Sequence, residues 1–430
     1  MPVIKTVQAN GVDEKEFFRA MRQRSGETAK QVTQAVSEII DAVRERGDEA
    51  VKEFTLRFDK KLPPYTEIPR DVINDALTDA DPELTDSLLN AIEQIAAFHN
   101  RQKQQGFIDA RPDGVILGQR VRGLSRVGIY VPGGTAAYPS SVLMNAIPAK
   151  IAGVGEIIMV TPPGENGLPN PDILLAAALS GVDRIFLMGG AQAVAALAYG
   201  TETVPKVDKI VGPGNIFVAT AKRLLYGVVD IDMIAGPSEI LIIADDSARP
   251  DFVAADLLSQ AEHDKLASAV LLTTSESLAK GVEAELERQL ALLPRRDIAE
   301  TSLKDFGAIV LCDSIDRAVE LANEIAPEHL EVLTEAPMEL LGRLDNAGSI
   351  FLGPWSPEPL GDYYAGPNHV LPTGGTARFF SPLSVDSFVK RSAFINYSQN
   401  ALMGAAEDVI RIAEKEGLTA HANSVRVRMK

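Results

Sequence analysis

Short apolar runs alternate with amphipathic stretches through the middle and later parts of the chain. After about Ser125, β-branched runs precede helical patterns in the segments RVGIYVPGG, EIIMVTPP, RIFLMGG and KIVGPG. After EILIIADD a second set begins, with strands expected near SAVLLTT, GAIVLCD and GSIFLG and helices expected near 251–263, 276–293 and 315–325. Alternation of this kind is typical of parallel sheets joined by right-handed crossovers. We therefore predict an α/β fold with two Rossmann-like parallel-sheet lobes.

The two ends of the chain show a different pattern. Apolar residues at helical spacing predict helices over 28–48 and 84–103, so the N-terminal region is expected to be mainly helical. His99 lies at the polar end of the second helix and is interpreted as solvated. A small helical tail is expected at the C-terminus, with a helix over 400–417.

These patterns suggest a division of the chain. We expect an N-terminal arm over 1–22 and a first α/β lobe made of 23–124 together with 236–378, which carries the catalytic and metal-binding candidates. The second α/β lobe is expected over 125–235, and a C-terminal tail over 379–430. Residues 353–382 are dense in Gly and Pro, and so long a connection is usually functional or disordered.

Composition narrows the class of protein. A length of 430 residues predicts more than one lobe, and no apolar run approaches the roughly 20 residues that span a bilayer. The net charge of −17 disfavours binding to nucleic acids or anionic lipid, so a small-molecule partner is expected. Cys312, the single cysteine, lies in an apolar run and is expected to be buried. With no basic and apolar leader, a cytoplasmic protein is expected.

Several polar residues are candidates for chemistry. Gln260 and His263 share one helical face and could reach one metal ion, or could simply hydrogen-bond to each other or to water. Asp362 would be a hard ligand on the Gly/Pro-rich segment, and a further His would complete a set that suits Zn²⁺. No HExxH motif is present to support the metal independently.

The segment IAPEHLEV offers a candidate acid and base. Pro327 suits the first position of a helix, which would place Glu328 and His329 in the first turn, the carboxylate ionised and the imidazole biased toward neutral. Such a pair could accept a proton and activate water. Alternatively, Glu328 complements the helix dipole and His329 is exposed.

Glycine-rich turns join predicted strands to helices at three places, Tyr130 to Gly134, Met188 to Ala193 and Gly212 to Asn215. Such turns let the backbone approach a pyrophosphate, although turns also need glycine for geometry alone. In the last turn, Phe217 occupies the place of the third glycine of the dinucleotide fingerprint.

Seven segments together resemble the histidinol dehydrogenase family, in the family's order and from about residue 20 to the C-terminus. They are GIYVPGGTAAYPSSVLMNAIPAKIAGV, GPGNIFVATAK, IAGPSEILIIAD, LLSQAEHD, IAPEHLEV, GDYYAGPNHVLPT and LTAHANS. The resemblance implies oxidation of L-histidinol through histidinal to L-histidine, the last steps of histidine biosynthesis, with reduction of two NAD⁺ and one Zn²⁺ per subunit.

The resemblance also assigns residues. It implies Glu328 and His329 as the catalytic pair, with Gln260, His263, Asp362 and His421 as zinc ligands that also bind substrate. Further substrate contacts would be Ser238, His329, His369 and Glu416, and NAD contacts would be Tyr130, Gln192 and Asn215. Family members are homodimers, so His421 and Glu416 would act in the site of the neighbouring subunit.

Two other classes of protein are considered. A zinc hydrolase or deaminase would use the same metal and water, but would have no need of three glycine-rich turns. A relative could instead act on another amino alcohol, or bind a metabolite without catalysis. The intact candidate residues disfavour the non-catalytic relative but do not separate histidinol from a related amino alcohol.

Overall fold

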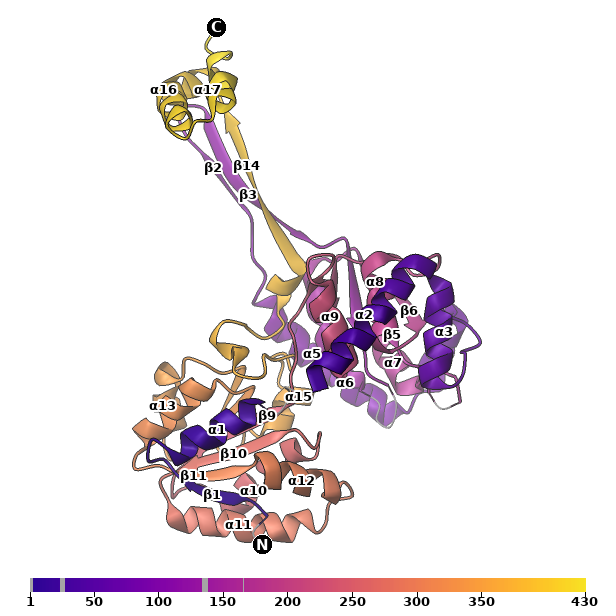
Figure 1. Cartoon of the computed structure of the whole chain (residues 1–430), viewed down its shortest axis with the longest axis vertical. Helices are drawn as coiled ribbons and strands as arrows, with labels where there is room; N and C mark the ends of the chain where they lie inside the picture. The colour runs from indigo at the N-terminus through magenta and orange to yellow at the C-terminus, as the bar shows by residue number, and fades with distance from the viewer. Residues whose placement is uncertain (1–2, 24–27, 134–137, 165) are drawn as a thin grey trace.

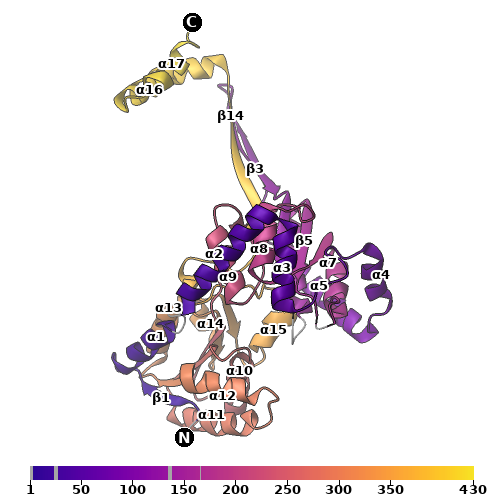
Figure 2. The ribbon, with the colours of Figure 1, turned by 45° about the vertical axis from the view of Figure 1, so that its right-hand side comes forward.

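The computed structural model describes residues 3–23, 28–133, 138–164 and 166–430. Two α/β lobes lie side by side, and a long ribbon carries a pair of helices away from both of them (Figures 1 and 2). We name the lobes by their sheets, the six-stranded lobe and the five-stranded lobe. The prediction of two parallel-sheet α/β lobes is confirmed. Among the helices formed by the described residues, none is both long enough and apolar enough to cross a membrane.

The six-stranded sheet has the order β1-β11-β10-β9-β12-β13, and every neighbouring pair is parallel. Its central strands are buried along their whole length, which explains why they read as continuous apolar runs rather than alternating ones. The strands are β1 (Lys5–Gln8), β9 (Glu239–Ala244), β10 (Ser268–Thr273), β11 (Ala308–Leu311), β12 (His329–Leu333) and β13 (Ser349–Leu352).

Helices cover both faces of this sheet, as buried parallel strands require. They are α1 (Asp13–Gln23), α10 (Pro250–Ala261), α11 (Glu276–Leu290), α12 (Arg296–Phe306) and α13 (Ile315–Ile325), with the short α14 (Pro337–Leu340) and α15 (Glu358–Tyr363). Cys312 follows β11 and is buried, as predicted, and burial raises the pKa of its thiol to about 11.

The five-stranded sheet has the order β6-β5-β4-β7-β8 and is also parallel. The chain order reverses between β4 and β7, and such a switch point is where open α/β sheets bind ligands, at the carboxyl ends of the strands. The strands are β4 (Arg126–Tyr130), β5 (Glu156–Thr161), β6 (Arg184–Leu187), β7 (Lys209–Val211) and β8 (Asp230–Ile231). The helices between them are α6 (Pro139–Ala152), α7 (Pro171–Ser180), α8 (Gly190–Tyr199) and α9 (Ile216–Leu225).

The N-terminal helices pack on the five-stranded lobe, which differs from the predicted grouping of 23–124 with 236–378. These helices are α2 (Thr28–Arg46), α3 (Asp48–Asp59), α4 (Arg70–Thr78) and α5 (Pro82–Asn100). Val36 and Val43 of α2 share a hydrophobic core with Val160 and Phe186, and α5 packs against α6. The predicted arm over 1–22 instead adds β1 and α1 to the six-stranded lobe. An apolar stripe shows that a helix must be buried but does not specify which sheet buries it.

Glu328 and His329 do not begin a helix, so that prediction is wrong. Helix α13 ends at Ile325, Ala326 takes a left-handed conformation at φ 54°, and His329 is the first residue of strand β12. Pro327 precedes the strand, where its missing N–H costs no ladder hydrogen bond. The alternation of strands and helices indicates a strand here instead, because a strand is expected after helix α13.

The C-terminal region contains a long strand as well as helices. Strand β14 (Val389–Tyr397) pairs antiparallel with β3 (Val115–Gly123), which also pairs with β2 (Phe107–Ala110). This ribbon ends in α16 (Gln399–Lys415) and α17 (Thr419–Arg426), which pack on each other. Both views place these two helices at the far end of the ribbon from the lobes (Figures 1 and 2).

His99 is buried, which contradicts the prediction that it is solvated. Its Nδ1 lies 2.7 Å from Gln102 Oε1 and its Nε2 lies 3.4 Å from Asn368 Nδ2. The polar end of α5 is covered by the segment over 353–382, which approaches closely at Gly366. A polar helix end can be buried when its groups find partners on a distant segment.

Candidate active site

A cavity of about 330 Å³ lies between the two lobes. Its wall combines the amino ends of β9 and β12 with the end of α10, α15, the 212–215 turn and the loop that carries His369. Eight of the predicted site residues line it, namely Asn215, Ser238, Gln260, His263, Glu328, His329, Asp362 and His369. Residues separated by more than a hundred positions in the sequence therefore meet at one place.

The backbone of Glu239 holds both members of the predicted catalytic pair. Its N–H donates to Glu328 Oε2 at 2.8 Å, and its carbonyl oxygen lies 3.0 Å from His329 Nδ1. Because a carbonyl can only accept, Nδ1 carries a proton, and Nε2 is the ring nitrogen that can gain or lose one. The parallel pairing of β9 with β12, which aligns His329 with Ile240, produces this arrangement.

Burial and charge perturb both groups. The Glu328 carboxyl is buried, which raises its pKa to about 7 even though the adjacent His329 and the Glu239 N–H oppose that rise. Burial alone would lower the pKa of His329, but the negative charges of Glu328, Asp362 and Glu358 raise it to about 10. The imidazole is thus biased toward the protonated form, opposite to the neutral form that the helix argument predicted.

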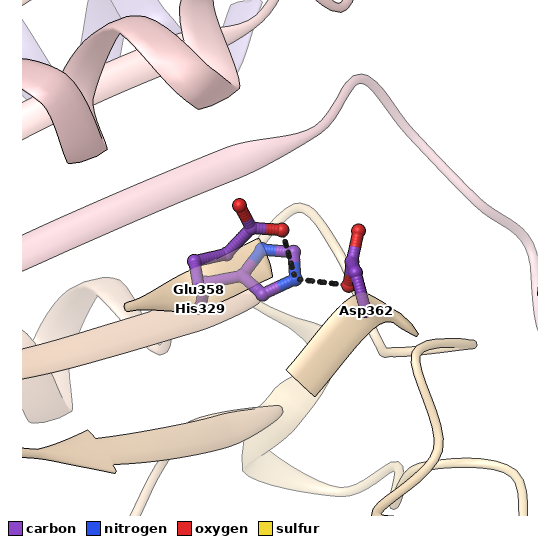
Figure 3. Close-up of side chains that lie close together, drawn as sticks. All are labelled: His329, Glu358 and Asp362. Atoms are coloured by element: carbon purple, nitrogen blue, oxygen red, sulfur yellow. Dashed lines mark ion pairs between the residues drawn. The ribbon is translucent and has the colours of Figure 1, made fainter. Parts of the chain in front are cut away.

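Glu358 is a buried member of the site that the sequence analysis did not identify. Its Oε1 lies 3.7 Å from His329 Nε2, and Asp362 Oδ1 lies 3.6 Å from the same nitrogen (Figure 3). The ligand atoms of the three residues lie within 4.8 Å of one another, which is close enough for a shared metal ion. Burial and the charge of Asp362 raise the pKa of Glu358 to about 8. Helical spacing from Asp362 could have identified it, since i and i+4 face the same way.

The three predicted metal ligands near the cavity differ in burial. Gln260 is buried on α10, and its Oε1 has no hydrogen-bond partner among the described residues. His263 is exposed just beyond the end of α10, yet the surrounding protein desolvates its ring enough to lower its pKa. Burial would raise the pKa of Asp362, but His329 and His369 lower it to about 2. These residues therefore offer an amide oxygen, a neutral imidazole and a carboxylate, each in the form that binds a cation.

Besides His329, the predicted substrate contacts Ser238 and His369 line the cavity, whereas Glu416 and His421 do not. Ser238 immediately precedes β9, and His369 Nδ1 lies 3.0 Å from the carbonyl oxygen of Asp362, which leaves its other ring nitrogen available. Glu416 and His421 lie at the end of α16 and in α17, where both are exposed. In this chain they are far from the cavity, at the tip of the ribbon (Figures 1 and 2).

The predicted cofactor contacts follow the carboxyl ends of the five-stranded sheet. Tyr130 ends β4, and its hydroxyl accepts a hydrogen bond from Gly190 N at 3.0 Å. Gln192 is buried in the first turn of α8, and neither amide atom has a hydrogen-bond partner among the described residues. Asn215 caps α9 and is exposed on the cavity wall. Gly134, the last residue of the first predicted turn, lies outside the described residues.

We expect Glu358→Ala to lower kcat/KM about 10–100-fold, as loss of a residue that orients metal ligands and bases generally does. The expected cause is movement of Asp362 and His329, both of which Glu358 contacts. Steady-state kinetics measure the effect, and Glu358→Gln should retain more activity because it keeps the side-chain volume. Glu339→Ala, on the exposed surface of α14, is the control and should change kcat/KM less than twofold. Equal activity of Glu358→Ala and the control would show that Glu358 has no positioning role.

Comparison with known proteins identifies the family. A family model described as histidinol dehydrogenase matches residues 22–429. The histidinol dehydrogenase of Clostridium acetobutylicum is 55% identical over 428 residues, covering 100% of this chain and 99% of that protein. That of Geobacter sulfurreducens is 56% identical over 417 residues, covering 96% of this chain and 97% of that protein.

A solved structure agrees with the sequence relatives. The crystal structure of histidinol dehydrogenase from Elizabethkingia anophelis superposes with a TM-score of 0.93 at 38% identity, covering 100% of this chain and 98% of that chain. The agreement extends over both lobes, the ribbon and the C-terminal helices, since the whole chain is covered. The chain belongs to the histidinol dehydrogenase family of NAD-dependent oxidoreductases.

Proposed function

We propose that this protein oxidises L-histidinol through L-histidinal to L-histidine, with reduction of two NAD⁺ and with one zinc ion per subunit. The observation that carries this proposal is the cavity between the lobes, where a fixed imidazole and a buried carboxyl face the candidate metal ligands and the 212–215 turn. The predicted small-molecule substrate is consistent with the size of this cavity, about 330 Å³.

The residues present fit a zinc ion. Gln260 Oε1 is buried without a partner among the described residues, and Asp362 and His263 have pKa values lowered toward their metal-binding forms. These three would hold the metal together with His421 from a second copy of the chain. A divalent cation near Asp362 would also oppose protonation of His329 and so lower its pKa toward the range of a useful base. Zinc would supply a fixed point for the substrate's nitrogen atoms, and NAD⁺ would supply the hydride acceptor.

The side chains of His329 and Glu328 have separate proposed roles. His329 accepts the proton of the substrate hydroxyl through Nε2, because Nδ1 is committed to the Glu239 carbonyl. Glu328 then accepts a proton from the water that adds to the aldehyde, forming the hydrate whose second oxidation gives the carboxylate. Ser238 and His369 of the same chain, together with Glu416 of the second copy, would orient the substrate. Tyr130, Gln192 and Asn215 would contact the cofactor at the carboxyl ends of the five-stranded sheet.

The first test is the number of NADH molecules formed when histidinol is consumed to completion. We expect two NADH per histidinol, no turnover after metal removal by a chelator, and recovery on addition of Zn²⁺. One NADH would mean that the reaction stops at the aldehyde and that the role given to Glu328 is wrong. No NADH would favour a related amino alcohol as substrate, or zinc-dependent hydrolysis. Full activity after verified metal removal would contradict the zinc site.

A further inference from the structure

We propose that the buried ion pair between Lys222 and Asp232 is a positioning pair that fixes the 212–215 turn for cofactor binding. This inference rests on the proposed function, since it takes Asn215 of that turn to contact the cofactor. Neither residue was among the site candidates predicted from the sequence. Both side chains border the cavity that contains Glu328 and His329.

Asp232 and Lys222 bind the backbone N–H and C=O of the same residue, Gly212. Asp232 Oδ2 accepts from Gly212 N at 2.8 Å, and Lys222 Nζ donates to Gly212 O at 2.9 Å. The two charged groups also contact each other directly. Their side chains are only 3% and 1% exposed, so both charges are removed from solvent. Gly212 is the first residue of the turn, and its N–H and C=O are therefore fixed from opposite sides.

The turn has little freedom to find another arrangement. Gly212 has φ +107°, and a Cβ there would lie 2.2 Å from the carbonyl oxygen of Tyr130. The backbone of the turn thus packs directly on the end of β4, which carries a proposed cofactor contact. Three residues later, Asn215 accepts hydrogen bonds from Phe217 N at 3.0 Å and Val218 N at 3.2 Å, and so starts α9. Lys222 lies on the same helix, so its hydrogen bond to Gly212 ties α9 to the turn.

Asp232 connects the turn to the substrate side of the cavity. Its Oδ1 accepts from Met233 N at 2.6 Å, and the chain then runs through Gly236, whose N–H donates to Thr373 Oγ1 at 2.6 Å. Ser238, a proposed substrate contact, follows two residues later. The pair therefore joins the cofactor turn to the segment that crosses between the lobes.

Fold stability alone is a poor explanation for a buried pair of charges. Taking two charges out of water is costly, and apolar residues of similar volume often stabilise a fold as well or better. Apolar residues here would leave the N–H and C=O of Gly212 without their present partners. The specific consequence of losing the pair is thus a turn that is no longer held in place.

The test compares cofactor and substrate affinities in the zinc-loaded enzyme. Lys222→Met removes the donor to Gly212 O, and Lys222→Met combined with Asp232→Asn removes both charges while keeping an acceptor for Gly212 N. We expect both variants to raise the Kd of NAD⁺, measured by calorimetry, at least tenfold. The Kd of histidinol and the zinc content should stay within twofold of wild type. The double variant tests the inference even if the single variant folds poorly, because it leaves no unpaired buried charge.

A nearby ion pair provides the matched control. Lys209, at the start of β7, pairs with Asp230 at 2.8 Å and donates to Ser387 O, and neither of these partners belongs to the turn. Lys209→Met should lower the melting temperature but leave the Kd of NAD⁺ within twofold. If the Lys222 variants lower the melting temperature and leave the Kd unchanged, the pair is merely structural and the inference is overturned.

Asn215→Ala separates this inference from the proposed function. If Asn215→Ala weakens NAD⁺ binding and the Lys222 variants do not, only the inference fails. If Asn215→Ala also has no effect on the Kd, the 212–215 turn is not a cofactor site, and both the inference and that part of the proposed function are overturned.

Discussion

We expect Glu328→Gln to reduce kcat for histidinol oxidation by about 10²–10⁴-fold, the usual contribution of a positioned general base. The amide keeps an oxygen to accept from Glu239 N, so the local structure should persist. It cannot take a proton from water, so hydration of the aldehyde is the step that should fail. Stopped-flow measurement of NADH formation would show whether the second oxidation is lost in preference to the first.

The pH dependence gives an independent signature of the same group. The pKa of Glu328 is raised to about 7, and a base acts only when it is deprotonated, so wild-type activity should fall as the pH drops below about 7. The variant should lose this limb of the pH profile. A wild-type limb that persists unchanged in Glu328→Gln would belong to another group.

As the pH rises through about 7, the contribution of Glu328 to the stability of the fold should decrease while its contribution to activity increases. A carboxyl whose pKa is raised by folding favours the folded state below its unfolded pKa, 4.5, and loses that contribution as the pH rises through about 7. Glu328→Gln should therefore be at least as stable as wild type at pH 8. Glu14→Gln is a contrasting control, because burial of Glu14 would raise its pKa but backbone hydrogen bonds, including those from Gly11 N, and Arg317 lower it. That variant should lose stability but keep kcat within twofold.

Replacement of His421 by Ala should abolish most activity, and mixing with a second inactive variant should restore part of it. His421 lies in α17 at the tip of the ribbon, away from the cavity of its own chain, so its proposed role as a metal ligand requires the cavity of another copy. A dimer of one His421→Ala chain and one His329→Ala chain would contain one intact site and one doubly defective site. Random pairing should therefore recover about a quarter of wild-type activity, since half of the dimers are mixed.

The control for this experiment uses two variants of the same lobe. Glu328 and His329 are adjacent in one cavity, so dimers of Glu328→Gln with His329→Ala contain no intact site. That mixture should stay inactive. Absence of recovery in the His421 mixture as well, with mixed dimers isolated by two affinity tags, would argue against sharing between subunits. Full activity of His421→Ala alone would remove its proposed role as a metal ligand.

The alternation of apolar runs and helical patterns was enough to predict two parallel-sheet lobes. Buried parallel strands such as β9 and β10 have apolar side chains on both faces, and this burial leaves a direct trace in the sequence. The types of residue able to bind a metal or move a proton could also be named, because chemistry depends on the side chain. Their assignment to particular roles came from the resemblance to a family, since ligands scattered over more than a hundred residues have no diagnostic spacing.

The tertiary structure decided how these residues meet. Glu328 and His329 are held by the backbone of Glu239, about ninety positions away, through the pairing of two parallel strands. The presence of Glu358 in the site and the packing of the N-terminal helices on the five-stranded lobe also depend on contacts between distant segments. The local sequence pattern does not specify such contacts. The sequence by itself thus indicated most of the helices and strands and the available chemistry, but not strand β12 at His329 or strand β14. Only the contacts between distant segments decided the geometry of the site, because a local pattern records that a residue is buried but not what buries it.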